Sequence, residues 1–159
     1  FKGFEYFQDK YLHLLRNRIE CSNQNWLWAD IHYEDTDFYG NALRHASMVY
    51  LPLPSETAPF VLDQERLLDR VAHLAGFKDI NFERHPDFSK RFKLKGEDEK
   101  SIRNFFEGPL IPFLESHKQY HIECNGRALL IFAKERHTTV SETKQMVNFA
   151  EQLTEVLKP

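Results

Sequence analysis

The chain has 159 residues, which is enough for one domain with a sizeable core, because a globular chain of this length buries about 70% of its unfolded surface. Its hydrophobic content of 42% and charged content of 28% are ordinary for a globular protein. The formal net charge of −3 excludes a strong global attraction to nucleic acid or to an anionic membrane, and the sequence contains no apolar run long enough for a membrane-spanning helix. We expect one domain over residues 1–159, either a complete protein or a part excised from a longer one.

The first third of the chain shows the alternation of apolar and polar residues that is typical of strands. The clearest example runs from Trp26 to Tyr33, where Leu27 and Ile31 alternate with Trp28 and His32. Prolines 52 and 54 should end the strand that follows, since proline cannot donate to a strand ladder. We expect a helical or irregular lead-in over 1–10, a strand or helix over 11–21, strands over 26–33 and 43–51, and a polar loop over 34–42.

The middle of the chain predicts a helix that begins with Asp63 as its N-cap and ends at Gly76, because Leu67, Val71 and Leu74 form an apolar stripe at helical spacing. Acidic residues at 97–99 suit the positive end of a further helix. Gly108 and Pro109 should interrupt that helix. We expect a strand over 77–83, its continuation over 88–95, a helix running on to Phe106, and a second helical piece over 111–116.

Asn125-Gly126 separates two apolar-rich runs and predicts a two-residue β-hairpin, because both central residues of a type I′ turn need positive φ. The expected register pairs Cys124 with Arg127 and Ile122 with Leu129. His121 and Glu123 would then share the opposite face with Ala128 and Leu130.

Thr139-Val140-Ser141-Glu142 has the pattern of a capping box at a helix start. The residues that follow present one apolar face, formed by Met146, Phe149, Leu153 and Val156. The order of elements is not a regular alternation of strand and helix. It predicts an α+β fold: a mostly antiparallel sheet with about three helices packed mainly on one face.

The strongest candidate for chemistry is the group around His85 and Asp87. On an extended strand, Glu83, His85, Asp87 and Ser89 would point to the same side, and imidazole beside carboxylates can act as a base or bind a metal. A metal-assisted hydrolase is therefore one alternative. Pro86 instead favours a polar turn that separates the side chains. We favour the turn and expect no metal and no cofactor.

Trp26 and Trp28 share a face with Asp30 and His32 on the predicted strand. Aromatic side chains beside a few polar groups can line a ligand pocket, which makes a small-molecule sensor the second alternative. The same tryptophans can pack against a helix instead, and we favour packing.

Other motifs with known chemistry do not occur. The sequence has no glycine-rich phosphate loop, no nucleophile elbow and no paired cysteine motif. Cys21 and Cys124 are too few for a disulfide framework. One structural disulfide between them is an open alternative, and we favour two buried free thiols in an intracellular chain. Arg91, Lys93 and Lys95 alternate with apolar residues, as in a strand with one solvated face, so we expect no nucleic-acid partner.

The chain also resembles an uncharacterised bacterial domain family whose members often carry this domain after predicted membrane segments. The resemblance covers residues 26–135 and depends on these segments: Leu51-Pro52-Leu53-Pro54, Phe60-Val61-Leu62, 76–82, His85-Pro86-Asp87-Phe88-Ser89, 92–96 and 102–106. The first 25 residues depart from the glycine-rich pattern of the family. The resemblance implies a bacterial source and a membrane-tethered parent, and it supplies no catalytic residues.

Together these observations predict a non-catalytic interaction or regulatory domain. We expect a protein partner or self-association, and a location inside the cell, either free or tethered at the cytoplasmic face of a membrane.

Overall fold

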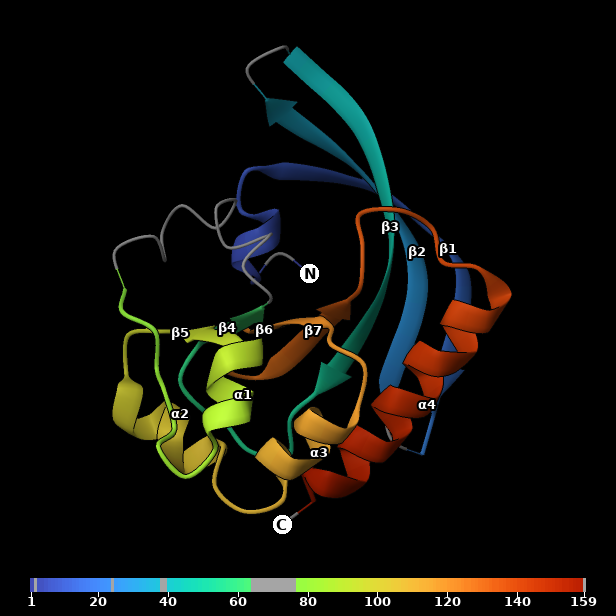
Figure 1. Ribbon diagram of the computed structural model, residues 1–159. Coiled ribbons are helices and arrows are strands. Elements are labelled where there is room, and N and C mark those ends of the chain that lie inside the picture. The colour runs from blue at the N-terminus through green and yellow to red at the C-terminus, as the bar shows by residue number, and fades with distance from the viewer. Residues whose placement is uncertain (2, 24, 38–39, 64–76, 159) are drawn as a thin grey trace.

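The computed structural model describes residues 1, 3–23, 25–37, 40–63 and 77–158 (Figure 1). Within these ranges, seven strands form one sheet in the order β1-β2-β3-β7-β6-β4-β5, and every neighbouring pair is antiparallel. The predicted α+β class is confirmed. The elements are η1 (Glu5–Phe7), β1 (Lys10–Cys21), β2 (Trp26–Asp37), β3 (Gly40–Pro52), β4 (Phe60–Asp63), α1 (Pro86–Arg91), β5 (Lys93–Lys95), α2 (Glu99–Phe105), α3 (Leu110–Ser116), β6 (His121–Cys124), β7 (Ala128–Phe132) and α4 (Val140–Val156).

The first three strands form a long ribbon that projects beyond the rest of the sheet (Figure 1). β3 pairs with β7 only from Val49 to Pro52, so along its earlier part β2 is the one strand of the described residues that pairs with it. The polar loop predicted over 34–42 is wrong, because β2 continues to Asp37 and pairs with the start of β3 at Gly40. Polar residues here do not mark a loop. This part of the ribbon has few apolar residues to bury, and its backbone hydrogen bonds still favour extended chain.

The two faces of the sheet carry separate cores. On one face the four α-helices of the described residues pack, with α4 lying across the ribbon (Figure 1). On the other face η1 packs its aromatic side chains against β2, β3 and β7. The helix-side core includes Trp26, Trp28, Val49, Leu51, Met146, Phe149 and Leu153, and the η1-side core includes Phe4, Tyr6, Phe7, Ile31, Tyr33, Met48, Leu130 and Phe132.

The segment around Pro86 is helical, so the strand predicted over 88–95 is wrong for most of its length. Pro86 occupies the first turn of α1, where its missing N–H costs nothing. The carboxylate of Glu115 accepts the N–H of Phe88 at 3.0 Å and so caps the helix from α3. Phe88 and Phe92 are four residues apart, and their ring centroids lie 4.9 Å apart in the core. This spacing is that of a helix.

Two further predictions in this region have different outcomes. The strand expected over 77–83 is wrong, since the segment has no regular structure and is fixed by a hydrogen bond from Ile80 N to the carbonyl of Leu94, at 2.8 Å. The helix expected after Asp63 lies outside the described residues, and Asp63 itself ends β4. The helices expected after residue 97 and after Pro109 are confirmed as α2 and α3.

The β6–β7 hairpin exists as predicted, but of Asn125 and Gly126 only Gly126 has positive φ, so the predicted type I′ turn is wrong. The predicted register is wrong by two residues, because Cys124 pairs with Leu129. The side chain of Asn125 accepts the N–H groups of Arg127 and Ala128, and this places one more residue pair within the turn. A shift of two residues preserves the faces, so the predicted grouping of side chains is confirmed.

The capping box of α4 is confirmed. Thr139 accepts the N–H of Glu142 at 3.3 Å, and Glu142 accepts the N–H of Thr139 at 2.9 Å. Met146, Phe149 and Leu153 are buried as predicted, while Val156 is half-buried at the end of the helix.

Candidate functional site

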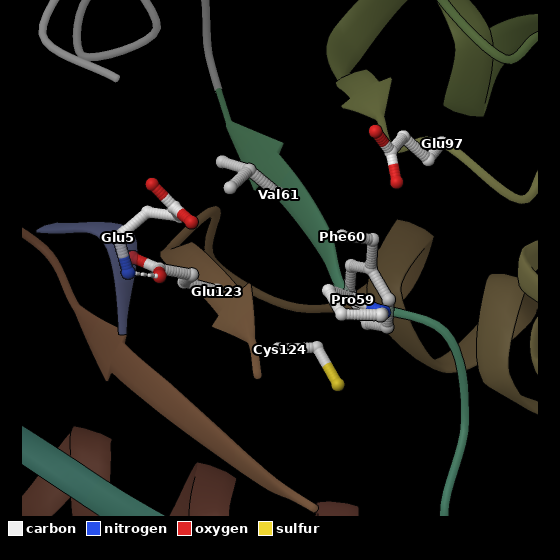
Figure 2. A pocket seen from close by; sticks show the side chains of 7 residues that line it. All are labelled: Glu5, Pro59, Phe60, Val61, Glu97, Glu123 and Cys124. Carbon is white, nitrogen blue, oxygen red and sulfur yellow. Dashed lines mark hydrogen bonds between the residues drawn. The ribbon is translucent and has the colours of Figure 1, made fainter. Parts of the chain in front are cut away.

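A small pocket of about 200 Å³ lies where η1, β4 and β6 meet. Figure 2 shows Glu5 beside Glu123, with the start of β4 between Glu5 and Glu97. Glu5 and Glu97 are exposed, whereas Glu123 is only 1% exposed. The pocket is lined by Glu5, Pro59, Phe60, Val61, Glu97, Glu123 and Cys124.

Glu123 has a structural role at this pocket. Its two carboxylate oxygens accept the backbone N–H groups of Glu5 and of Tyr6, the latter at 3.1 Å. Burial raises the pKa of Glu123, and these two hydrogen bonds partly oppose that rise. The carboxylate therefore anchors the N-terminal segment to β6, which is remote from that segment in sequence.

Cys124 cannot act as a ready nucleophile here. Burial raises the pKa of its thiol to about 12, although a hydrogen bond from the N–H of Gly126 to the sulfur, at 3.3 Å, opposes the rise. Because the thiolate is the reactive form, a thiol with this pKa stays protonated and inert at neutral pH. Cys124 is therefore a packed thiol of the core.

A buried polar row extends from the pocket along the η1-side face. His121 Nδ1 lies 3.0 Å from Oδ2 of Asp63, and both side chains are almost fully buried. The hydroxyl of Tyr6 lies 2.6 Å from that of Tyr33 and donates to Glu135 at 2.7 Å. Burial raises the pKa of Tyr6 and raises that of Tyr33 to about 12, so both phenols stay neutral.

An open groove of about 500 Å³ lies beside the segment that contains His85. Nδ1 of His85 lies 3.9 Å from Oε2 of Glu115. Asp87 instead points to solvent, and its Oδ1 lies 3.8 Å from Nζ of Lys90. The structure therefore does not bring the two catalytic candidates together. The groove is lined by Asn81, Phe82, Glu83, Arg84, His85, Arg103, Phe106, Glu107, Gly108 and Ile111.

Trp26, Trp28, Asp30 and His32 share the helix-side face of β2, as the alternation predicted. Trp26 and Trp28 are 3% and 5% exposed and belong to the core that α4 covers. Asp30 is buried as well, and it accepts hydrogen bonds from Ser47 and from Asn17. Of the four, only His32 is partly exposed.

Beyond Asp30, two cross-strand rows of the ribbon lie outside the core beneath α4. The outer row is Tyr11, Glu34 and Leu43, and the next row is Leu14, His32 and His45. We call these six residues the ribbon face. Tyr11 and Leu43 are each 69% exposed, and Leu14 is 42% exposed.

Sequence reasoning missed the ribbon face apart from His32. One strand was predicted to end before Glu34 and the next to begin at Leu43, so Glu34 fell in the expected loop and Leu43 beside it, whereas Tyr11 fell at the start of the element expected over 11–21. The available signal was that Tyr11 and Leu43 are apolar residues within polar runs, but their proximity depends on a three-strand register that the sequence does not state.

As the side chains stand, no group of three or more His, Cys, Asp or Glu residues in the described part of the chain could hold a metal ion. None of the helices in that part is long and apolar enough to cross a bilayer.

No family model matches the chain, and no curated protein matches it. Among solved structures, the chain is similar to a crystal structure of the mycobacterial trehalose monomycolate transport factor A, TtfA. The TM-score is 0.49 at 8% sequence identity, and the match covers 99% of this chain and 92% of that chain. A likeness at this level carries no information about function.

Proposed function

We propose that this chain is a non-catalytic interaction domain that binds a partner protein through the ribbon face. One observation carries the proposal. The exposed large apolar side chains of the described residues are Tyr11, Leu14, Ile19, Leu43 and Val140, and all lie on the helix side of the ribbon or at the first residue of α4.

Single apolar side chains are scattered over the surface of most proteins, whereas exposed apolar side chains that cluster on one face mark interaction sites. The ribbon face combines a tyrosine and two leucines with histidines, and Glu34 is its one carboxylate. Protein interfaces are enriched in aromatic side chains and poor in charge at their centre.

The composition of the face favours a protein over a lipid surface. Membrane-binding surfaces combine apolar residues with clusters of lysine or arginine, and the six residues of the ribbon face include neither. A heterologous partner is favoured over a second copy that would extend the sheet. β1 is an edge strand, but it has bulges between Leu12 and Leu14 and between Arg16 and Ile19. These bulges interrupt the regular row of backbone N–H and C=O groups with which a strand of a second copy would pair.

The test is site-specific photocrosslinking in the cells that produce the protein. A photoreactive phenylalanine analogue replaces Tyr11 in one variant and Leu43 in another. A matched control places it at Asn104 on α2, which is also exposed but lies near β4, towards the other end of the strand order. We expect the same crosslinked protein from both ribbon positions and not from Asn104, with the product lost when Leu14 is also replaced by aspartate.

A crosslinked product with the mass of two copies of this chain would contradict the proposal of a different partner protein, and would show that the ribbon face binds a second copy instead. Crosslinks to lipid, or crosslinks that form equally at Asn104, would contradict the proposal. A tethered parent protein stays a prediction of the sequence resemblance, and the sequence that precedes Phe1 in the gene tests it.

A further inference from the structure

Three imidazole rings meet at the inner row of the ribbon face. His32 and His45 lie directly opposite each other on β2 and β3, and their ring centroids are 6.1 Å apart. The ring of His137, from the segment between β7 and α4, lies 5.2 Å from His32 and 4.2 Å from His45. Each ring therefore neighbours both of the others.

Hydrogen bonds hold the segment with His137 against the ribbon. Ser47 N donates to the carbonyl of Arg136 at 3.2 Å, and Thr138 N donates to Oγ of Ser47 at 2.8 Å. Ser47 in turn donates to the buried carboxylate of Asp30. These bonds fix the residues on both sides of His137, so the third imidazole is placed by the fold and not by a free loop.

The donor atoms of this cluster suit a cation that prefers nitrogen ligands. Neutral imidazole offers a lone pair, and it is the commonest side-chain ligand of zinc and copper. Magnesium and calcium prefer oxygen ligands and have little affinity for such a group.

We propose that His32, His45 and His137 bind one divalent transition-metal ion of the zinc or copper type. With a metal–nitrogen distance of about 2.1 Å, tetrahedral ligation places two imidazole centroids about 5 Å apart. The observed centroid separations of 4.2–6.1 Å bracket that value. As the side chains stand, the three rings do not form such a site. His45 and His137 are exposed, so both can turn their nitrogens towards a shared ion without disturbing the core.

Such an ion would join the segment before α4 to two strands of the ribbon, and three protein ligands leave a coordination position for water or for a group from a partner. The inference goes beyond the proposed function, because it concerns the isolated chain and needs no partner protein.

The test is calorimetric titration of the full chain with Zn²⁺ and Cu²⁺, with Mg²⁺ as the control ion, at about pH 7.5, where imidazole is neutral. We expect one site for Zn²⁺ or Cu²⁺ and none for Mg²⁺. His45→Asn and His137→Asn should each weaken binding about tenfold or more, which corresponds to about 1.4 kcal/mol per lost ligand. Both substitutions are at exposed positions, so folding should be retained.

His13→Asn and His85→Asn are matched controls at other partly or fully exposed histidines, and they should leave binding unchanged. The electron paramagnetic resonance spectrum of the Cu²⁺ form should show nitrogen ligands that decrease in number in the His45 and His137 variants. Absence of binding across the micromolar range, binding that survives both substitutions, or binding that depends on His13 or His85 would overturn the inference. None of these results depends on the crosslinking outcome.

Discussion

The backbone N–H of Tyr6 donates a hydrogen bond to Oε2 of Glu123, 3.1 Å away, and so joins the beginning of the chain to a strand near its end. The other oxygen of Glu123 accepts the N–H of Glu5. One buried carboxylate thus satisfies two donors at the start of η1, which would otherwise lose their hydration without compensation.

Replacement of Glu123 by alanine should destabilise the protein by about 1–3 kcal/mol, because two backbone donors then lack their acceptor. Glu123→Gln should fall between the wild type and the alanine variant, since the amide retains one acceptor oxygen. Urea unfolding of the three proteins measures the order. An alanine variant as stable as the wild type would show that the N-terminal segment is not held by this carboxylate.

Leu153 on α4 is 1% exposed and belongs to the core beneath that helix. Leu153→Ala should lower the free energy of unfolding by about 2–5 kcal/mol through lost burial and the cavity that remains. Val140→Ala on the same helix is the control, because Val140 is 75% exposed and the change should be within about 0.5 kcal/mol. Similar losses in the two variants would mean that α4 is not anchored through this face.

Gly126 has φ of +95°, and a side chain there would place its Cβ 3.2 Å from the carbonyl oxygen of Thr57. Gly126→Val should destabilise by about 1–3 kcal/mol, because a β-branched residue resists positive φ. Gly108 separates the effect of positive φ from that of a close contact with the added Cβ. It has φ of +81°, but a Cβ added there would meet no atom within 4 Å. Thermal unfolding of Gly126→Ala and Gly108→Ala should therefore show the greater loss at Gly126, and equal losses would remove the steric part of the explanation.

Glu142 should make stability depend on pH in the acid range. Its hydrogen bonds with Arg136, then that from the N–H of Thr139, lower its pKa from 4.5 to about 2. Because the folded state holds the carboxylate ionised, this contribution is present above about pH 4.5 and is lost as the pH falls towards 2. Urea unfolding of wild type and Glu142→Gln across this range should converge at the acid end. A difference that stays constant with pH would contradict the assignment.

Local chemistry in the sequence predicted several parts of the fold correctly. The capping box at Thr139 and the β6–β7 hairpin each depend on a few neighbouring residues, and both are present. The hairpin register was missed because Asn125 uses its side chain to enlarge the turn, an effect that the Asn-Gly pair does not reveal. The helix at Pro86 was missed because its cap comes from Glu115, which is remote in sequence.

The candidate site was harder to predict for the same reason. His32 was placed on the correct face from alternation alone, and the burial of Trp26 and Trp28 follows from their apolar character. The meeting of His32 with His45 and His137 requires the β2–β3 register and the return of the chain after β7. No short segment of sequence contains that information.

The short contact between β3 and β7 also orders the assembly of the molecule. The β1–β2 and β2–β3 pairings join neighbouring segments, so they close short loops at little entropic cost. Val49 and Ile131 come from distant parts of the chain, and their pairing must wait for a much larger loop to close. The ribbon is therefore the part that can form early, and the remaining strands are added to an edge that already exists.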